Sequence, residues 1–110
     1  MEKQIDIRGF VIPYRGEVDL NGTSLMGEFE VTYKEIKRIF GKENDVFDSY
    51  KSDASWKVMT PAGPASIYNY KNGKNYLGKE GTPKTNITEW HIGAHNINAY
   101  AWVCFALFAN

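Results

Sequence analysis

The chain has 110 residues, 43% of them hydrophobic, which is enough for one domain (residues 1–110) whose core needs no disulfide. Thirteen basic residues balance thirteen acidic ones, so the chain lacks the positive field that favours a polymeric nucleic acid or an anionic membrane as partner. The single cysteine, Cys104, excludes an intramolecular disulfide, and the first residues lack the apolar run of a signal peptide, so we expect an intracellular protein.

The first predicted elements are an edge strand and a turn. Hydrophobic residues alternate irregularly over residues 5–12, and Pro13 follows, which favours a strand at the edge of a sheet. Residues 16–27 are rich in glycine and small polar side chains, and their Asn-Gly-Thr-Ser sequence is typical of a turn. Amides and hydroxyls in such a turn, including Thr23 and Ser24, could also bind a phosphate, although a plain turn between strands is the more common outcome.

A helix is predicted between Thr32 and Gly41. Thr32 and Glu35 form a capping box, and Gly41 is typical of a helix C-terminus. Apolar side chains recur between them with helical spacing, so one side of this helix should pack on a sheet. The following residues 43–55 contain three aspartates, but these lack the glycine and the closing glutamate of a calcium loop, and we expect no metal there.

Three β-like runs, residues 56–60, 65–71 and 90–93, are predicted to form the sheet, and the Pro- and Gly-containing residues between the first two predict a hairpin. Because side chains alternate along a strand, one side of the sheet should be a core. The core residues would be Trp56, Val58, Ala65, Ile67, Trp90 and Ile92. The other side, which we call the open face, would carry Lys57, Met59, Ser66, Tyr68, Tyr70, Glu89 and His91. This second set is too aromatic and too rich in hydrogen-bonding groups for an ordinary solvated surface, so we interpret it as a working surface.

The C-terminal third should contain a long loop and a hydrophobic helix. Residues 72–84 are expected to lie beside the open face. Asn96 is a suitable helix N-cap, and the buried stripe should comprise Ile97, Tyr100, Ala101, Cys104, Leu107 and Phe108. Trp102 and Phe105 then remain on the outer side. A helix that is apolar all round must be covered on all sides, so we predict a homo-oligomer formed through Trp102 and Phe105.

The sequence contains no recognisable catalytic motif. His91 and His95 are four residues apart, but a glycine lies between them and no third ligand is near, so we expect no metal. Cys104 lies in the apolar stripe, where burial should raise its pKa and leave a packed thiol. A nucleophile elbow and a phosphate-binding loop are both lacking in the sequence. We therefore predict that the protein is not an enzyme and needs no cofactor.

Ligand binding is better supported by the residue types. Tyrosine rings can stack on a base, lysines can contact a phosphate, and hydroxyl or imidazole groups can read polar edges. The candidate ligand-binding residues are Thr23, Ser24, Tyr68, Tyr70, Lys71, Lys74, Tyr76 and His91. For Tyr70, Lys71 and His91, a purely structural role is an equally open alternative. Trp90 shares the parity of Ile92 and is assigned to the core.

Three motifs carry a resemblance to a known family. They are Gly-Thr-Ser-Leu-x-Gly at residues 22–27, Ile-Tyr-x-Tyr-Lys at residues 67–71 and Trp-His-Ile-Gly at residues 90–93. Together with the helix, they resemble a widespread family of small tailed-phage proteins over about residues 21–93, while the opening strand and the hydrophobic C-terminal helix depart from its pattern. This family is similar to phage sponge proteins that sequester cyclic-nucleotide signals of CBASS immunity. The resemblance implies that a homo-oligomer in the host cytoplasm captures a cyclic dinucleotide such as cGAMP without hydrolysing it.

Two alternatives use the same features differently. The aromatic surface and the acidic residues 43–55 could bind a host defence effector, as in an anti-CRISPR or anti-restriction inhibitor. Alternatively, Trp102 and Phe105 could be subunit contacts of a minor virion assembly protein. For every alternative, the expected fold class is α+β, with a small antiparallel sheet covered on one face by two helices.

Overall fold

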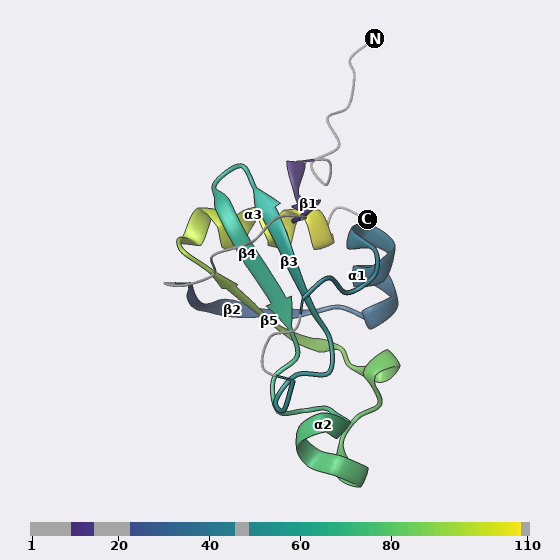
Figure 1. Cartoon of the computed structure of the whole chain (residues 1–110). Coiled ribbons are helices and arrows are strands. Elements are labelled where there is room, and N and C mark those ends of the chain that lie inside the picture. Colours follow the sequence, from purple (N-terminus) through teal and green to yellow (C-terminus); the bar gives the residue numbers. More distant parts are fainter. Residues whose placement is uncertain (1–9, 15–22, 46–48, 109–110) are drawn as a thin grey trace.

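The structure is organised around one antiparallel sheet with the strand order β1-β3-β4-β5-β2 (Figure 1). It is a computed structural model that describes residues 10–14, 23–45 and 49–108. The strands within these ranges are β1 (Ile12–Pro13), β2 (Ser24–Glu30), β3 (Ser55–Thr60), β4 (Gly63–Tyr68) and β5 (Glu89–Ala94). The hairpin predicted between the first two β-like runs is confirmed as the β3–β4 pair, because Thr60 pairs with Gly63 around a two-residue turn.

Two helices, α1 (Tyr33–Phe40) and α3 (Ile97–Phe108), pack on one face of the sheet (Figure 1). A short helix, α2 (Lys74–Leu77), lies beyond the end of β4, and it is followed by the single 3₁₀ turns Gly78–Glu80 and Lys84–Asn86. The predicted α+β class, with a small antiparallel sheet and two helices on one face, is confirmed. The region expected to be a long loop instead folds into these short helical turns.

The core lies between the sheet and the two helices, as the strand parity predicted. Trp56, Val58, Ala65, Ile67, Trp90 and Ile92 are all fully buried. The rings of Trp56 and Trp90 meet edge to face with centroids 5.5 Å apart, and the ring of Tyr33 lies 5.8 Å from that of Trp56. The predicted packing of α1 on this side of the sheet is therefore confirmed.

Both ends of α1 lie where its sequence predicts, although only one half of the capping box is present, because the Glu35 carboxylate pairs with Arg38 at 2.8 Å. The Thr32 hydroxyl accepts a hydrogen bond from the Glu35 amide at 3.1 Å, and Gly41 ends the helix at φ 85°, where glycine is favoured. The indole N–H of Trp56 donates to the Gly41 carbonyl at 2.9 Å, and that of Trp90 donates to the Val31 carbonyl at 2.8 Å. The two core tryptophans thus hold the chain on both sides of the helix and leave no indole donor unsatisfied.

The helix α3 is rotated relative to the sequence prediction. Asn96 caps it as expected, because its side-chain oxygen accepts a hydrogen bond from the Ala99 amide at 2.9 Å. The fully buried residues are Ala99, Val103, Ala106 and Leu107, whereas Ile97 and Phe108, which were predicted to be buried, are exposed. The Tyr100 side chain reaches β2, where a Cβ atom at Gly27 would be 2.5 Å from the Tyr100 hydroxyl.

Two predictions at the start of the chain need correction. Ser24 to Gly27 form part of the strand β2 and pair with β5, so this part of the expected turn is extended backbone. The edge strand β1 includes Pro13, which an edge position tolerates because one side of the strand needs no ladder hydrogen bond. Phe10 and Val11, which were also predicted to be in the strand, precede it, and residues 5–9 and 16–22 lie outside the described residues.

Candidate functional site

Four rings and the Lys71 ammonium gather where β4 and β5 meet the α2 region. At their margin, the Tyr50 ring lies 5.2 Å from that of Tyr76, and the Lys51 ammonium lies 6.0 Å from the Tyr70 centroid. The rings of Tyr70 and His91 are nearly parallel, with centroids 5.3 Å apart and an interplanar angle of 25°. The ring of Tyr68 meets His91 edge on at 5.6 Å. The Lys71 ammonium lies 5.2 Å from the Tyr70 centroid and 5.3 Å from the Tyr76 centroid. We call Tyr68, Tyr70, Lys71, Tyr76 and His91 the ring cluster.

His91 is held in the cluster by the register of the sheet. Glu28 of β2 lies opposite His91 of β5, and the distance between His91 Nε2 and Glu28 Oε1 is 3.0 Å. The carboxylate is mostly exposed, whereas the imidazole is partly covered by the two tyrosine rings. His91 thus contacts β2 through Nε2 while its ring lies nearly parallel to that of Tyr70.

The cluster is open on one side and closed on the other. Tyr70 is 36% exposed, and Lys71 is also exposed, whereas Tyr68 is 8% exposed. Burial raises the pKa of the Tyr68 hydroxyl, and the neighbouring Tyr70 adds to this effect. Ser66, on the same face of the sheet, is also buried. The open face is therefore accessible only in part. Tyr70 and Glu89 are exposed, and the half-buried members are Lys57, Met59 and His91.

The structure brings together five of the eight predicted ligand-binding residues. Lys74 is exposed at the start of α2 in the same region, without a contact that links it to the rings. Ser24 pairs with Ala94, three residues along β5 from His91, which corresponds to about 10 Å at the usual rise of a strand. Thr23 precedes it. Because Ser24 is in an extended strand, the proposed phosphate-binding turn does not include it, and Thr23 and Ser24 lie away from the stacked pair.

Sequence reasoning missed the residue that supports the cluster, Asn69. Its side chain is fully buried, and its Oδ1 accepts hydrogen bonds from the amides of Asp53 and Ala54 at 2.8 and 3.0 Å. Its Nδ2 donates to Asp53 Oδ1 at 2.9 Å and to Asn72 Oδ1 at 3.0 Å. The available signal was the recurrence of asparagine at positions 69, 72 and 75, since asparagine side chains commonly bond to the backbone of turns.

Comparison with known proteins gives no family assignment. No protein-family model matches the chain, and a search of curated proteins finds no match. Within the described residues, no three histidine, cysteine, aspartate or glutamate side chains are grouped so that they could hold a metal ion. Among the same residues, no helix has the length and apolar character needed to cross a membrane.

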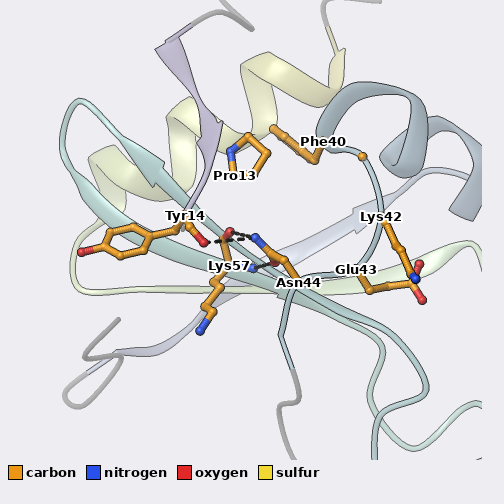
Figure 2. A pocket seen from close by; sticks show the side chains of 8 residues that line it. Pro13, Tyr14, Phe40, Lys42, Glu43, Asn44 and Lys57 are labelled. Atoms are coloured by element: carbon orange, nitrogen blue, oxygen red, sulfur yellow. Dashed lines mark hydrogen bonds between the residues drawn. The ribbon is translucent and has the colours of Figure 1, made fainter. Parts of the chain in front are cut away.

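A separate cavity of about 550 Å³ lies near the β1 edge of the sheet (Figure 2). It is lined by Pro13, Tyr14, Phe40, Gly41, Lys42, Glu43, Asn44 and Lys57. The Asn44 amide donates to the carbonyls of Tyr14 and Lys57 at 3.3 and 3.0 Å and accepts from the Lys57 amide at 2.8 Å. Its polar side chain is thus used to hold β1 and the residues after α1 against β3. None of the eight predicted ligand-binding residues lines this cavity.

Two lysines outside the ring cluster are paired with carboxylates. Lys84 Nζ lies 3.1 Å from Glu43 Oε2, and the Tyr33 hydroxyl donates to the other oxygen of the same carboxylate. Burial would raise the pKa of Glu43, but the hydrogen bonds from Tyr33 and Lys84 outweigh it and lower that pKa. Lys57 Nζ lies 3.9 Å from Asp45 Oδ1. The positive charge of each lysine is therefore balanced by a carboxylate of the same chain.

Proposed function

We propose that the protein captures a cyclic oligonucleotide immune signal, for example a cyclic dinucleotide such as cGAMP, without hydrolysing it. The observation that carries the proposal is the stacked, partly exposed pair of Tyr70 and His91 beside the Lys71 ammonium. The three sequence motifs resemble a family of small tailed-phage proteins that is similar to phage sponge proteins, and this resemblance supports the same class of ligand. The proposed consequence is inhibition of CBASS-type immunity in the host cytoplasm.

The arrangement suits a ligand that combines an aromatic base with a phosphate. The Tyr70 ring is 36% exposed and already carries the His91 ring, with the ammoniums of Lys71 and Lys51 over it at 5.2 and 6.0 Å. A base that stacks on this ring takes the place of one of these groups, and base–aromatic stacking contributes about 1–3 kcal/mol per base. A phosphate beside that base can reach the Lys71 ammonium, which lies next to the same ring. Capture requires only these contacts. His91 and Glu28 are capable of acid–base chemistry, so the test must also ask whether the ligand survives.

The proposal is tested by titrating the purified protein with a panel of nucleotides in a calorimeter. The panel contains 3′,3′-cGAMP, cyclic di-AMP, cyclic di-GMP and cyclic tri-adenylate, with the linear dinucleotide pApA as control. We expect tight binding of at least one cyclic member, and we expect heat denaturation to release it unchanged in mass. A panel that remains unbound, or a ligand that returns linear, contradicts the proposal. Capture of a host protein together with an unbound panel supports the inhibitor alternative.

We also propose that the protein acts as a homo-oligomer through the outer side of α3. This helix contains no charged residue, and its Phe105 is 55% exposed. Beside Phe105 lies a hollow of about 340 Å³, lined by Asn98, Ala101, Trp102 and Phe105. A protruding ring and a hollow on the same helix face are self-complementary, because a two-fold axis can place each Phe105 into the hollow of the other copy.

Phe105→Asp is expected to dissociate this assembly. An aspartate would have to lose its hydration in an apolar contact, which a stable interface does not tolerate without a partner. Light scattering after size-exclusion chromatography should give a multiple of the chain mass for the wild type and a single chain mass for the variant. Thr85→Asp, at an exposed position outside α3, should leave the mass of the assembly unchanged. A monomeric wild type at micromolar concentration would rule out this part of the proposal.

A further inference from the structure

Lys71 has an unusual backbone conformation. Its φ is 58°, and it is the one residue other than glycine with a positive φ among the described residues. A side chain with a Cβ atom is disfavoured there, because the Cβ approaches the following carbonyl oxygen. Such conformations persist where the surrounding structure enforces them, and they are concentrated at functional sites.

The enforcing structure is a clasp formed by Asn69 and Asn72. Their side chains are joined by a hydrogen bond of 3.0 Å, which closes the chain around Tyr70 and Lys71. The Lys71 amide donates to the Lys51 carbonyl at 2.8 Å. Asn72 Nδ2 also donates to the Glu89 carbonyl at 3.2 Å, so the bend is tied to the start of β5. Tyr70 and Lys71 therefore project from a bend that is fixed on both sides.

The ammonium that this bend presents has no carboxylate partner within the described residues. The contacts of Lys71 are the two tyrosine rings and its own backbone hydrogen bond. Lys57 and Lys84, in contrast, are partly covered and paired with Asp45 and Glu43. A cation held between two rings, with no carboxylate beside it in the part of the chain that the structure describes, is suited to accept an anion from outside.

We propose that Lys71 is the anion anchor of the ring cluster and that Asn69 and Asn72 are its positioning residues. The anchor contacts a phosphate oxygen of the ligand while the base lies on Tyr70. The strained backbone is kept because a relaxed conformation would direct the ammonium away from the two rings. This inference rests on the proposed function for the identity of the ligand, although the anchor itself requires only a phosphate group.

The variant Lys71→Gly distinguishes the effect of the backbone strain on stability from the effect of the ammonium charge on binding. Glycine adopts a positive φ without a steric penalty, so the midpoint of thermal unfolding should stay the same or rise. Loss of the ammonium should weaken binding about tenfold, which corresponds to one charge-assisted contact. The probes are 3′,3′-cGAMP and inorganic tripolyphosphate, titrated at two salt concentrations. The variant should also lose part of the salt dependence, because one charge no longer contributes to binding.

Two further variants make the result specific. Lys71→Arg retains the charge and should keep most of the affinity, whereas Lys79→Gly removes an exposed lysine from the 3₁₀ turn Gly78–Glu80 and should have no effect on binding. If Lys71→Gly binds cGAMP as tightly as the wild type, the assignment of Lys71 as the anion anchor is wrong and the proposed function stands. If the wild type binds tripolyphosphate through Lys71 but no cyclic nucleotide, the anchor stands and the proposed function is wrong. If the wild type binds neither probe, the anchor is overturned.

Discussion

Asn69→Ala is expected to lower the free energy of unfolding by about 3 kcal/mol, because each buried polar group that loses its partner costs about 1–3 kcal/mol. The asparagine side chain makes four hydrogen bonds, and the amides of Asp53 and Ala54 would lose theirs. Water cannot easily replace these bonds, since the site is fully buried. Urea denaturation at neutral pH, followed by tryptophan fluorescence, measures the change.

Two control variants complete this experiment: Asn86→Ala at the surface and the nearly isosteric Asn69→Asp at the buried site. Asn86→Ala removes an exposed asparagine from the 3₁₀ turn Lys84–Asn86 and should change the stability by less than about 0.5 kcal/mol. Asn69→Asp keeps the acceptor but places a second carboxylate beside Asp53, and two like charges there repel each other when both are ionised. This repulsion is absent at low pH, where the carboxyl groups are protonated, and it grows as the pH rises. Asn69→Asp should therefore lose less stability at pH 4 than at pH 7, and equal losses would contradict the hydrogen-bond assignment.

The core of the fold could be predicted from the sequence because its signals are local. Alternation along three short runs assigned Trp56 and Trp90 to the buried side, and both are fully buried. A capping box and a terminal glycine gave both ends of α1. Each of these features depends on residues a few positions apart, so no knowledge of the strand order was needed.

The candidate site was predicted only in part, because it depends on contacts between distant segments. Tyr70 and His91 stack because β4 and β5 are neighbours, and parity allowed this to be anticipated. Thr23 and Ser24 were placed in the same site by residue type alone. The register of β2 on β5 decides their position, and it brings Glu28 rather than Ser24 opposite His91. No local pattern determines that register.

The orientation of α3 and the role of Asn69 show a similar limit. Every side of α3 is apolar, so periodicity could not determine which side packs on the sheet. Asn69 lies within residues 65–71, which the sequence predicts to be a strand, whereas β4 ends at Tyr68. It is buried because Asp53 and Ala54, which are distant in the sequence, present their amides to it.

Tyr70→Ala is expected to weaken the binding of a cyclic dinucleotide by about tenfold to a hundredfold, since one stacked base contributes about 1–3 kcal/mol. The alanine removes the ring that stacks on His91, and it also removes one of the two rings beside the Lys71 ammonium. Because Tyr70 is already 36% exposed, the fold should lose little stability. Calorimetric titration with 3′,3′-cGAMP gives the affinity, and thermal unfolding of the same samples checks that the variant is folded.

The comparison with Tyr70→Phe and Tyr14→Ala locates the ligand. Tyr70→Phe keeps the ring and should retain most of the affinity, because stacking uses the ring face and not the hydroxyl. Tyr14 lines the cavity near β1, on the far side of β3 and β4 from His91, so Tyr14→Ala should leave the affinity unchanged. If Tyr14→Ala weakens binding and Tyr70→Ala does not, the ligand occupies that cavity and the ring cluster is a structural feature. An effect of Tyr70→Ala alone places the base on the tyrosine ring.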